Sequence, residues 1–421
     1  MRTVASIDAS PSSIYAACRA VMVNNQSPYM LSDSRRIVSD GRMERLPIMI
    51  HRSTRIPPVL ANIRLLRRRT ALASESRMKL GAHFCHIYWW TDAFMPDFEQ
   101  RLLKGEVPNI QLIRDGLINW LRHASITQSM NRTAQMFVGV NTYNARVRAL
   151  RGLIDEALDL AIADANKSLE QISKIKMQRE ALDNIFESNL FAPQDADERE
   201  ALSKVELELL LDASRPVSRL NPWRGYIPKI RNYPMTLLLF RQGIRRGELA
   251  GMMKDDVLEI EGQHYIRVFR RPDDDRDPRK RQPAAKTQPR VLPISIETWT
   301  VLQHYIRKVR PMTKAALEHD YLFVSSRTGA PLSLSGVNIA IAQLGFVLGR
   351  RIFPHIGRHT VASDYLADAR EDGKTEKEAR GGLMSLCGWK SEGSVERYTK
   401  RERDRTRDEV LKKHQRKVFD E

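Results

Sequence analysis

The sequence predicts a mostly helical α+β fold in two domains, the second of which contains a small antiparallel sheet. Three observations support this prediction. The chain has 421 residues, which is too many for one ordinary compact core. Apolar residues recur at helical spacing over most of the chain, whereas short stretches between positions 257 and 294 alternate as strands do. Hydrophobic residues make up 42% of the chain and charged residues 29%, as in folded globular proteins.

The balance of charges indicates a polyanionic partner. The formal net charge is +18 at pH 7 and the sequence pI is about 9.9. Nucleic acid is the simplest such partner. A basic membrane-surface protein is the alternative, but it needs a basic amphipathic anchor or a lipidation signal, and we find neither in the sequence.

The few cysteines and the lack of long apolar runs predict a cytoplasmic protein with no membrane partner. Cys18, Cys85 and Cys387 are odd in number and far apart, which argues against a disulfide framework and for a reducing compartment. No apolar run approaches the ~20 residues that span a bilayer. The first residues, with Asp8 among scattered polar side chains, also lack the apolar run of a signal peptide.

Residues 1–62 are interpreted as an N-terminal extension. Residues 32–36 and 40–42 have the composition of loops, and residues 46–50 that of a short strand before Pro57 and Pro58. We expect the extension to pack on the next domain. An accessory DNA-binding segment is the alternative.

Residues 63–175 are expected to form a helical bundle with at least one basic face. Two helices carry apolar residues at helical spacing, one ending at Pro96 and one following Pro108: Phe84, Ile87, Tyr88, Thr91 and Phe94, then Ile110, Ile113, Leu117 and Leu121. A third begins near Thr142 and places its apolar residues on one side: Val147, Leu150, Leu153, Ile154, Leu158 and Ala161. Asn144, Arg148 and Arg151 share another side, which is either solvated, the usual case, or in contact with phosphates.

Two features of this bundle have competing interpretations. His83, Cys85 and His86 suggest a metal site, but their spacing is wrong for a helical pair of ligands and no second ligand cluster follows. Core or surface histidines are therefore expected. Trp89 and Trp90 are expected to serve packing rather than base stacking.

Residues 176–200 are interpreted as a linker and residues 201–421 as a second domain. In the second domain, Ser203 is expected to cap a helix that carries Val205, Leu207, Leu209 and Leu210. Another helix follows Trp223, carries Ile230, Leu237, Leu238 and Phe240, and ends at Gly243.

Strands are predicted at residues 257–260, 264–269 and 290–294, with another near 322–324 and helices elsewhere. The charged excursion at 273–281 opens with three aspartates, which could hold Mg²⁺. Because no other carboxylates stand at liganding spacing, a solvated hairpin loop is the preferred interpretation.

The second domain contains residues that can stabilise a reacting phosphodiester. Its transition state gains negative charge on the non-bridging oxygens, which metal ions or fixed arginines can neutralise. Without a carboxylate cluster for a metal, we expect Arg245 and Arg358 to clamp the phosphate, with no metal and no cofactor. His355 lies one helical turn before Arg358 and should share its face.

A tyrosine near the end of the chain is the candidate nucleophile. The hydroxyl of Tyr398 has a reference pKa of about 10 and needs help at neutral pH, either from His355 as proton acceptor or from the field of the clamp. Lys286, at a strand turn, is a candidate general acid for the leaving 5′-oxygen. Trp389 offers an indole N–H and a broad face that can buttress the site.

These residues resemble the tyrosine recombinases, or phage integrase family. The first box of the family reads Gly-Leu-Arg-x-x-Glu-Leu, and residues 243–249 read Gly-Ile-Arg-Arg-Gly-Glu-Leu. The second reads His-x-Leu-Arg-His-Thr, and residues 355–360 read His-Ile-Gly-Arg-His-Thr. The third, Leu-Gly-His or Trp, matches residues 386–389, and Tyr398 follows Trp389 by the nine positions typical of the nucleophile. Lys286 matches the strand-turn lysine of the family.

The resemblance implies an architecture and an activity. It implies a SAM-like core-binding domain at 63–175, whose last helix opens at 141–144, and a catalytic domain with a small antiparallel sheet, together forming a C-shaped clamp on duplex DNA. Tyr398 would form a 3′-phosphotyrosyl link, and four subunits would exchange strands between two DNA sites, associated with the nucleoid. The long N-terminus suggests the integrase of a phage or other mobile element, working with accessory DNA-bending or directionality proteins.

Departures from the pattern and alternatives qualify the resemblance. Gly357 replaces the usual leucine, which is expected to loosen the start of that helix. Trp389 stands where most bacterial members have histidine, and Lys280 is a second candidate for the lysine. Glu248 and His359 are expected to support the site rather than react. A type IB topoisomerase-like enzyme, a non-catalytic DNA-binding protein that retains the fold and, more distantly, an RNA-binding protein are the alternatives.

Overall fold

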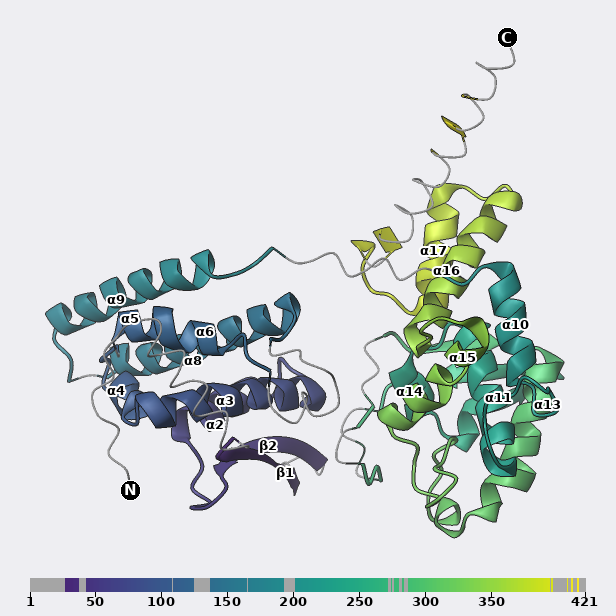
Figure 1. Cartoon of the computed structure of the whole chain (residues 1–421), viewed down its shortest axis with the longest axis horizontal. Coiled ribbons are helices and arrows are strands. Elements are labelled where there is room, and N and C mark those ends of the chain that lie inside the picture. The colour runs from purple at the N-terminus through teal and green to yellow at the C-terminus, as the bar shows by residue number, and fades with distance from the viewer. Residues whose placement is uncertain are drawn as a thin grey trace. The chain divides into compact units, whose positions relative to one another are not determined.

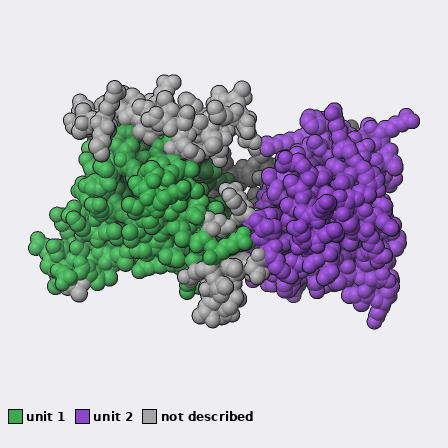
Figure 2. All heavy atoms as spheres, turned by 90° about the horizontal axis from the view of Figure 1, so that it is seen from below, with its two compact units in different colours: residues 1–195 green, residues 196–421 purple. Residues whose placement is uncertain are grey.

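The computed structural model describes residues 27–37, 43–107, 109–124, 137–164, 166–192, 201–271, 274, 276–279, 282–283, 287–393, 395–396, 407, 410–411 and 415. Lys280, Lys286 and Tyr398 therefore lie outside the described residues. The chain divides into two compact units, Met1–Asp195 and Ala196–Glu421, which Figure 2 distinguishes by colour. None of the described helices is both long and apolar enough to cross a bilayer.

Unit 1 combines a two-stranded hairpin with a bundle of helices (Figure 1). Its strands β1 (Tyr29–Ile37) and β2 (Met43–His51) pair antiparallel from Tyr29 opposite His51 to Ile37 opposite Met43. Its helical elements are α2 (Val59–Arg67), α3 (Ser74–Phe94), α4 (Phe98–Leu103), α5 (Ile110–Leu112), the π-helical turn η1 (Ile113–Leu117), α6 (Ile118–Trp120), α8 (Val140–Ile162) and α9 (Leu169–Ser188).

The hairpin packs on the bundle, as expected for the described part of the extension. Both strands lie against α3, and the Leu31 side chain approaches so closely that a Cβ at Gly81 would lie 2.6 Å from it. The Tyr29 hydroxyl donates to Asp92 over 2.9 Å, and Met49 is fully buried. The prediction of a loop at 32–36 was wrong, because these residues pair with β2 along their whole length. Residues 1–26 lie outside the described part.

The three predicted helical patterns are confirmed, and the alternatives within them can be decided. Every apolar residue predicted on one side of α8 is buried. His86 is a core histidine stacked on Trp120, with ring centroids 4.9 Å apart. Trp89 and Trp90 are buried packing residues. Among the described residues, no group of three His, Cys, Asp or Glu side chains could hold a metal ion.

The predicted basic face of α8 is largely engaged inside unit 1. Asn144 is 2% exposed, and its amide donates to the carbonyl of Phe191 and accepts from the N–H of the same residue. Arg151 forms ion pairs with Asp183 and Glu187 of α9. Of the three predicted residues, Arg148 alone is exposed. The phosphate-binding interpretation of this side was therefore wrong for Asn144 and is unsupported for Arg151.

The interpretation of 176–200 as a linker was wrong for its first half. Residues 169–188 form α9, which begins with a capping box made by Ser168 and Gln171. Ile175, Leu182 and Phe186 recur at intervals of seven and four, and all three are buried. This spacing is a sparse helical stripe among many charged residues, which hides it from a reading of composition alone.

Unit 2 is built from helices around a three-stranded antiparallel sheet, with strand order β3 (Val257–Ile260), β4 (Gln263–Val268), β5 (Arg290–Pro293). Its helical elements are α10 (Lys204–Ser214), α11 (Tyr226–Phe240), α12 (Arg246–Gly251), η2 (Lys254–Asp256), α13 (Ile296–His304), η3 (Tyr305–Val309), η4 (Arg310–Met312), η5 (Lys314–Glu318), α14 (Leu334–Ala342), α15 (Gly345–Leu348), α16 (Pro354–Glu371) and α17 (Glu376–Cys387). The predicted fold class, mostly helical α+β with a small antiparallel sheet, is confirmed.

Two details of unit 2 differ from the predictions. Ser203 caps α10 as expected, yet Val205 is 75% exposed, so the buried face of this helix runs through Leu210 and Leu211 instead. The predicted strand near 322–324 is reduced to isolated bridges, Met253 with Tyr321 and Val324 with Pro331.

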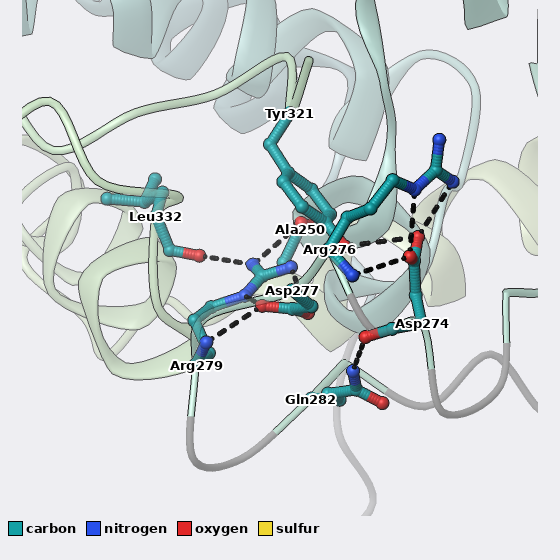
Figure 3. A network of polar contacts seen from close by, with 8 residues as sticks. All are labelled: Ala250, Asp274, Arg276, Asp277, Arg279, Gln282, Tyr321 and Leu332. Carbon is teal, nitrogen blue, oxygen red and sulfur yellow. Dashed lines mark hydrogen bonds and ion pairs between the residues drawn. The ribbon is translucent and has the colours of Figure 1, made fainter. Parts of the chain in front are cut away.

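The charged excursion between β4 and β5 is anchored at Asp277 and Arg279 (Figure 3), whereas Asp273 and Asp275 lie outside the described residues. Arg279 forms a bidentate ion pair with Asp277, with both distances 2.8 Å, and donates to the carbonyls of Ala250 and Leu332. Its guanidinium lies over the ring of Tyr321, 4.6 Å from the centroid. Asp277 is 2% exposed, so the interpretation as a solvated hairpin loop was wrong here. Its carboxylate is occupied by arginine rather than available to a cation.

Candidate active site

The turn before α12 places Arg245. Gly243 has a φ of +62°, a left-handed conformation that ends the preceding helical segment and favours glycine. Arg245 is the N-cap residue of α12, and its backbone N–H donates to the Glu248 carboxylate over 2.9 Å. Glu248, in the first turn of this short helix, therefore fixes the backbone of Arg245.

The start of α16 places His355 and Arg358. Pro354 occupies the first turn, where a missing N–H costs nothing. Gly357 lets α16 approach α11 closely: a Cβ at this position would lie 2.4 Å from the carbonyl oxygen of Leu239. The expectation that Gly357 loosens the helix start was wrong, because the helix runs unbroken from Pro354 and the glycine permits its packing.

These two helix starts line one hollow of about 690 Å³. Arg245, His355 and Arg358 all contribute to its wall. The other lining residues are Arg246, Gly247, Asn338, Arg351, Phe353 and Pro354. The first turn of α16 also directs its partial positive charge toward this wall, which adds to the attraction for an anion.

Arg358 is held rigidly and forms part of the floor of the hollow. Its side chain is almost fully buried, donates to the Gly243 carbonyl over 2.9 Å and donates to the Cys387 carbonyl. The guanidinium lies over the Trp389 ring, 5.1 Å from the centroid. Of the five N–H donors of this guanidinium, two thus serve to hold the side chain in place.

Arg245 is poised to receive an anion. Burial, followed by the nearby positive charge of Arg358, lowers the pKa of Arg245 to about 10. Its Nη1 atom is buried without a hydrogen-bond acceptor among the described residues, and the nearest carboxylate oxygen, on Glu248, is 3.7 Å away. An oxyanion in the hollow would accept from this donor and relieve the repulsion between the two arginines.

Glu248 connects the start of α12 to the strand turn before β5. Its carboxylate accepts from Arg290 over 2.8 Å and from the hydroxyl of Thr287, and all three side chains are buried. Burial alone would raise the pKa of Glu248, but these hydrogen bonds and the charge of Arg290 outweigh it and lower the pKa. Glu248 is thus a fixed anion, as expected of a supporting residue.

The turn at Gly388 and Trp389 is joined to the same strand turn. Gly388 ends α17 in a left-handed conformation and accepts from the Gln288 N–H over 3.0 Å. A Cβ at Gly388 would lie 2.9 Å from Arg290 Nη1. Residues 287–290 therefore contact both the start of α12, through Glu248, and the turn at Gly388.

His359 lies behind His355, with the two rings edge to face and their centroids 4.6 Å apart. It is 7% exposed and does not line the hollow, which fits a supporting role. Arg290, Thr287, Arg351 and Asn338 are neighbours of the site that the sequence did not single out. The signal available for Arg290 and Thr287 was their place beside Lys286 at the start of a strand, whereas nothing local marks Arg351 or Asn338.

The second unit is similar in sequence to a known family. Residues 201–405 match the sequence profile of the phage integrase family. The tyrosine recombinase XerD of Chlorobaculum tepidum is 26% identical over 163 residues, which is 38% of this chain and 46% of that protein. The chain thus aligns with less than half of the length of this curated relative.

Two solved structures align with most of the chain. The recombinase XerH, in a post-cleavage complex with its palindromic difH substrate, aligns over 94% of this chain and 94% of its own, with 14% identity and a TM-score of 0.48. The Tn1549 transposon integrase, in complex with a circular intermediate DNA, aligns over 81% and 94%, with 14% identity and a TM-score of 0.43.

The fold and the hollow first define a class, a mixed α+β protein whose second unit presents fixed arginines to an anion. The sequence match then specifies the family. Over residues 201–405 the chain is similar to the phage integrase family, also called the tyrosine recombinases.

Proposed function

We propose that this protein is a site-specific DNA recombinase that cuts and rejoins duplex DNA through a 3′-phosphotyrosyl intermediate formed by Tyr398. The observation that carries this proposal is the hollow in which Arg245, His355 and Arg358 meet at the starts of two helices. Similarity to the tyrosine recombinase family supplies the reaction class.

In the proposed reaction the phenol oxygen of Tyr398 attacks the phosphorus atom and the bond from phosphorus to the 5′-oxygen breaks. The phenol proton passes to His355, and the leaving 5′-oxygen receives a proton from Lys286. One phosphodiester is exchanged for another, so the reverse reaction with a new 5′-hydroxyl rejoins the DNA. Neither hydrolysis nor an external energy source is needed.

The two arginines would stabilise the extra charge of the transition state. Both are held by the protein before the ligand arrives, Arg358 by two carbonyls and Arg245 by its place in the helix cap. Preorganised donors of this kind are worth roughly 10²–10³ in rate for each donor removed. Trp389 supports Arg358 through its ring face.

The contacts around the strand turn support Lys286 rather than Lys280 as the general acid. Lys286 directly precedes Thr287, which bonds to Glu248, and Gln288, which bonds to Gly388 beside Trp389. Lys280 directly follows Arg279, which is tied to Ala250 and Leu332 (Figure 3).

The residues before Tyr398 support its delivery to the same hollow. Val395 is fully buried in one apolar cluster with Trp389 and Cys387. Tyr398 follows Val395 by three positions, and three residues of chain span at most about 11 Å. This is compatible with attack on the phosphate held by the same chain.

The proposed substrate is duplex DNA held in a C-shaped clamp, with four subunits acting on two sites. The net charge of +18 supports a polyanion, and binding should weaken steeply with salt. We further propose a cytoplasmic, nucleoid-associated role in the integration or excision of a phage or other mobile element, aided by accessory DNA-bending or directionality proteins.

A suicide substrate tests the chemistry. Duplexes nicked near the cleavage site should trap a covalent protein–DNA adduct, and mapping of the attached peptide should identify Tyr398. Tyr398→Phe should bind DNA yet form no adduct. The matched control is Tyr226→Phe, since Tyr226 is a half-exposed tyrosine of unit 2 far from the family boxes, and it should retain the adduct.

The outcomes separate the alternatives. An adduct that persists in Tyr398→Phe would contradict the assignment of the nucleophile. No adduct from the natural sequence on its own DNA sites would favour a DNA-binding protein that retains the fold. Adducts without joined products from two DNA sites would favour a type IB topoisomerase-like enzyme.

A further inference from the structure

We propose that the hollow contains a second phosphate subsite, in which Arg246, Arg351 and Asn338 bind the phosphate adjoining the scissile one on the same strand. This inference rests on the proposed function, because it requires a DNA strand in the hollow. It assigns a binding role to three residues outside the catalytic set.

The charge of the hollow exceeds what one phosphate can balance. Four guanidinium groups line it, and none of the lining residues that the structure describes carries a carboxylate. Glu248, the carboxylate nearest to Arg245, is already shared with Arg290. Arg246 and Arg351 form no ion pair with any described residue. A single phosphodiester carries one negative charge, so a second phosphate is the natural complement of the remaining pair.

The size of the hollow leads to the same conclusion. Its volume is about 690 Å³. A phosphate group has five heavy atoms, and at the ~30 Å³ that a water molecule takes in the liquid they fill on the order of 150 Å³. The hollow therefore has room for the scissile phosphate and for the sugar and phosphate next to it.

The four arginines of the hollow differ in exposure. Arg358 is 1% exposed, Arg245 and Arg246 are partly exposed, and Arg351 lies at the surface. Arg351 thus lies on the solvent side of the hollow, where a strand enters. One DNA strand presents a charge about every 3.4 Å along the helix axis, so one phosphate can contact Arg245 and Arg358 while the next contacts Arg246 and Arg351.

Asn338 adds a donor on the facing helix. It lies on α14, which contacts both α12 and α16, the helices that carry the other lining residues. Its amide can donate to a phosphate oxygen without adding charge. The subsite is consequently built from three separate segments, each anchored in the core of unit 2.

A double-mutant cycle between protein and DNA tests the subsite. Methylphosphonate, which removes the charge of one phosphate, is placed on either side of the scissile position in otherwise identical duplexes. With the natural protein, one of these substitutions should weaken binding about tenfold, and the Arg246→Gln, Arg351→Gln double variant should bind the unmodified duplex more weakly by a similar factor.

Combining the two changes distinguishes a direct contact from a general loss of charge. In the double variant, the sensitive methylphosphonate should have no further effect, and the salt slope should be reduced by roughly 0.9 for the phosphate lost. Arg307→Gln, at an exposed position away from the hollow, should keep full sensitivity to the methylphosphonate. Thermal unfolding verifies that each variant is folded.

The inference would be overturned if neither methylphosphonate weakened binding. It would also be overturned if the losses of binding free energy caused by the methylphosphonate and by the double variant were additive. The proposed function fails in a different way, through the absence of any covalent adduct between the natural protein and an unmodified suicide duplex. The two failures are measured on different DNA substrates and cannot be confused.

Discussion

Substitution of Gly357 by alanine should destabilise unit 2, although alanine is the better helix former. At an unhindered helix position this change is worth about 1 kcal/mol in favour of alanine. At Gly357 the new Cβ would lie 2.4 Å from the Leu239 oxygen, 3.0 Å from its carbonyl carbon and 3.1 Å from the Phe240 ring. Two of these three atoms belong to the backbone of α11, which cannot rotate away.

The net effect can be worked from these contacts. Overpacking of a tight core costs about 1–3 kcal/mol, and a backbone contact this short belongs at the upper end. Subtracting the helix gain leaves a loss of about 2 kcal/mol, or roughly 4–8 °C in Tm for a unit of this size. The displaced α16 carries His355 and Arg358, so adduct formation should fall by as much as about 10²-fold.

Gly381 provides the matched control. It lies within α17, and a Cβ there would meet nothing within 4 Å. Gly381→Ala should therefore raise the Tm by roughly 2–4 °C, through the helix gain alone. Differential scanning calorimetry of the three proteins decides the matter. If Gly357→Ala and Gly381→Ala shifted the Tm by the same amount, the packing argument for this glycine would be refuted.

Three further predictions follow from buried charges. Glu248→Ala should lower the free energy of unfolding by about 3–5 kcal/mol in urea titrations, because it leaves Arg290 buried without its carboxylate; a loss under 1 kcal/mol would contradict this. Arg279→Gln should lower the free energy of unfolding by a similar amount. The control is Arg276→Gln, which removes an ion pair with the same Asp-x-Arg spacing but from a side chain that is 62% exposed, and it should lower the free energy of unfolding by no more than about 1 kcal/mol. Equal effects of the two variants would refute the anchoring role of Arg279. Burial, with nearby positive charges, lowers the pKa of His83 to about 4. Between pH 6.5 and 4 the unfolded chain therefore binds a proton that the folded chain excludes, and the free energy of unfolding falls as the pH drops from about 6.5 to 4. His83→Gln should reduce this pH dependence by about 1.4 kcal/mol per pH unit, and an unchanged slope would contradict the prediction.

The helices and the sheet were predictable where periodicity is local and strong. The stripe of α8 and the alternation of β3, β4 and β5 were both visible in the sequence. Prediction failed where the pattern is sparse or charged. The buried stripe of α9 is diluted by lysines and glutamates, and β1 carries two arginines and an aspartate that make it resemble a loop. Pairing with β2 and packing on α3 compensate for that composition.

The candidate site was likewise predictable only in part. The order and spacing of Arg245, His355 and Arg358 are properties of the chain, and they identify the family whatever the fold looks like in detail. Some partners of these residues lie far away in the sequence. Arg358 bonds to Gly243, 115 positions away, and no local pattern encodes that distance.

By itself, then, the sequence determined the residue types that we propose to bind and attack a phosphodiester, and most of the helical framework that carries them. Only the tertiary structure decided that Glu248, Thr287 and Arg290 join the strand turn to the site, that Arg246 and Arg351 share its hollow, and that Gly357 must be small. The physical reason is that periodicity reports which face of an element is buried, whereas hydrogen bonds and close contacts depend on which other element meets that face.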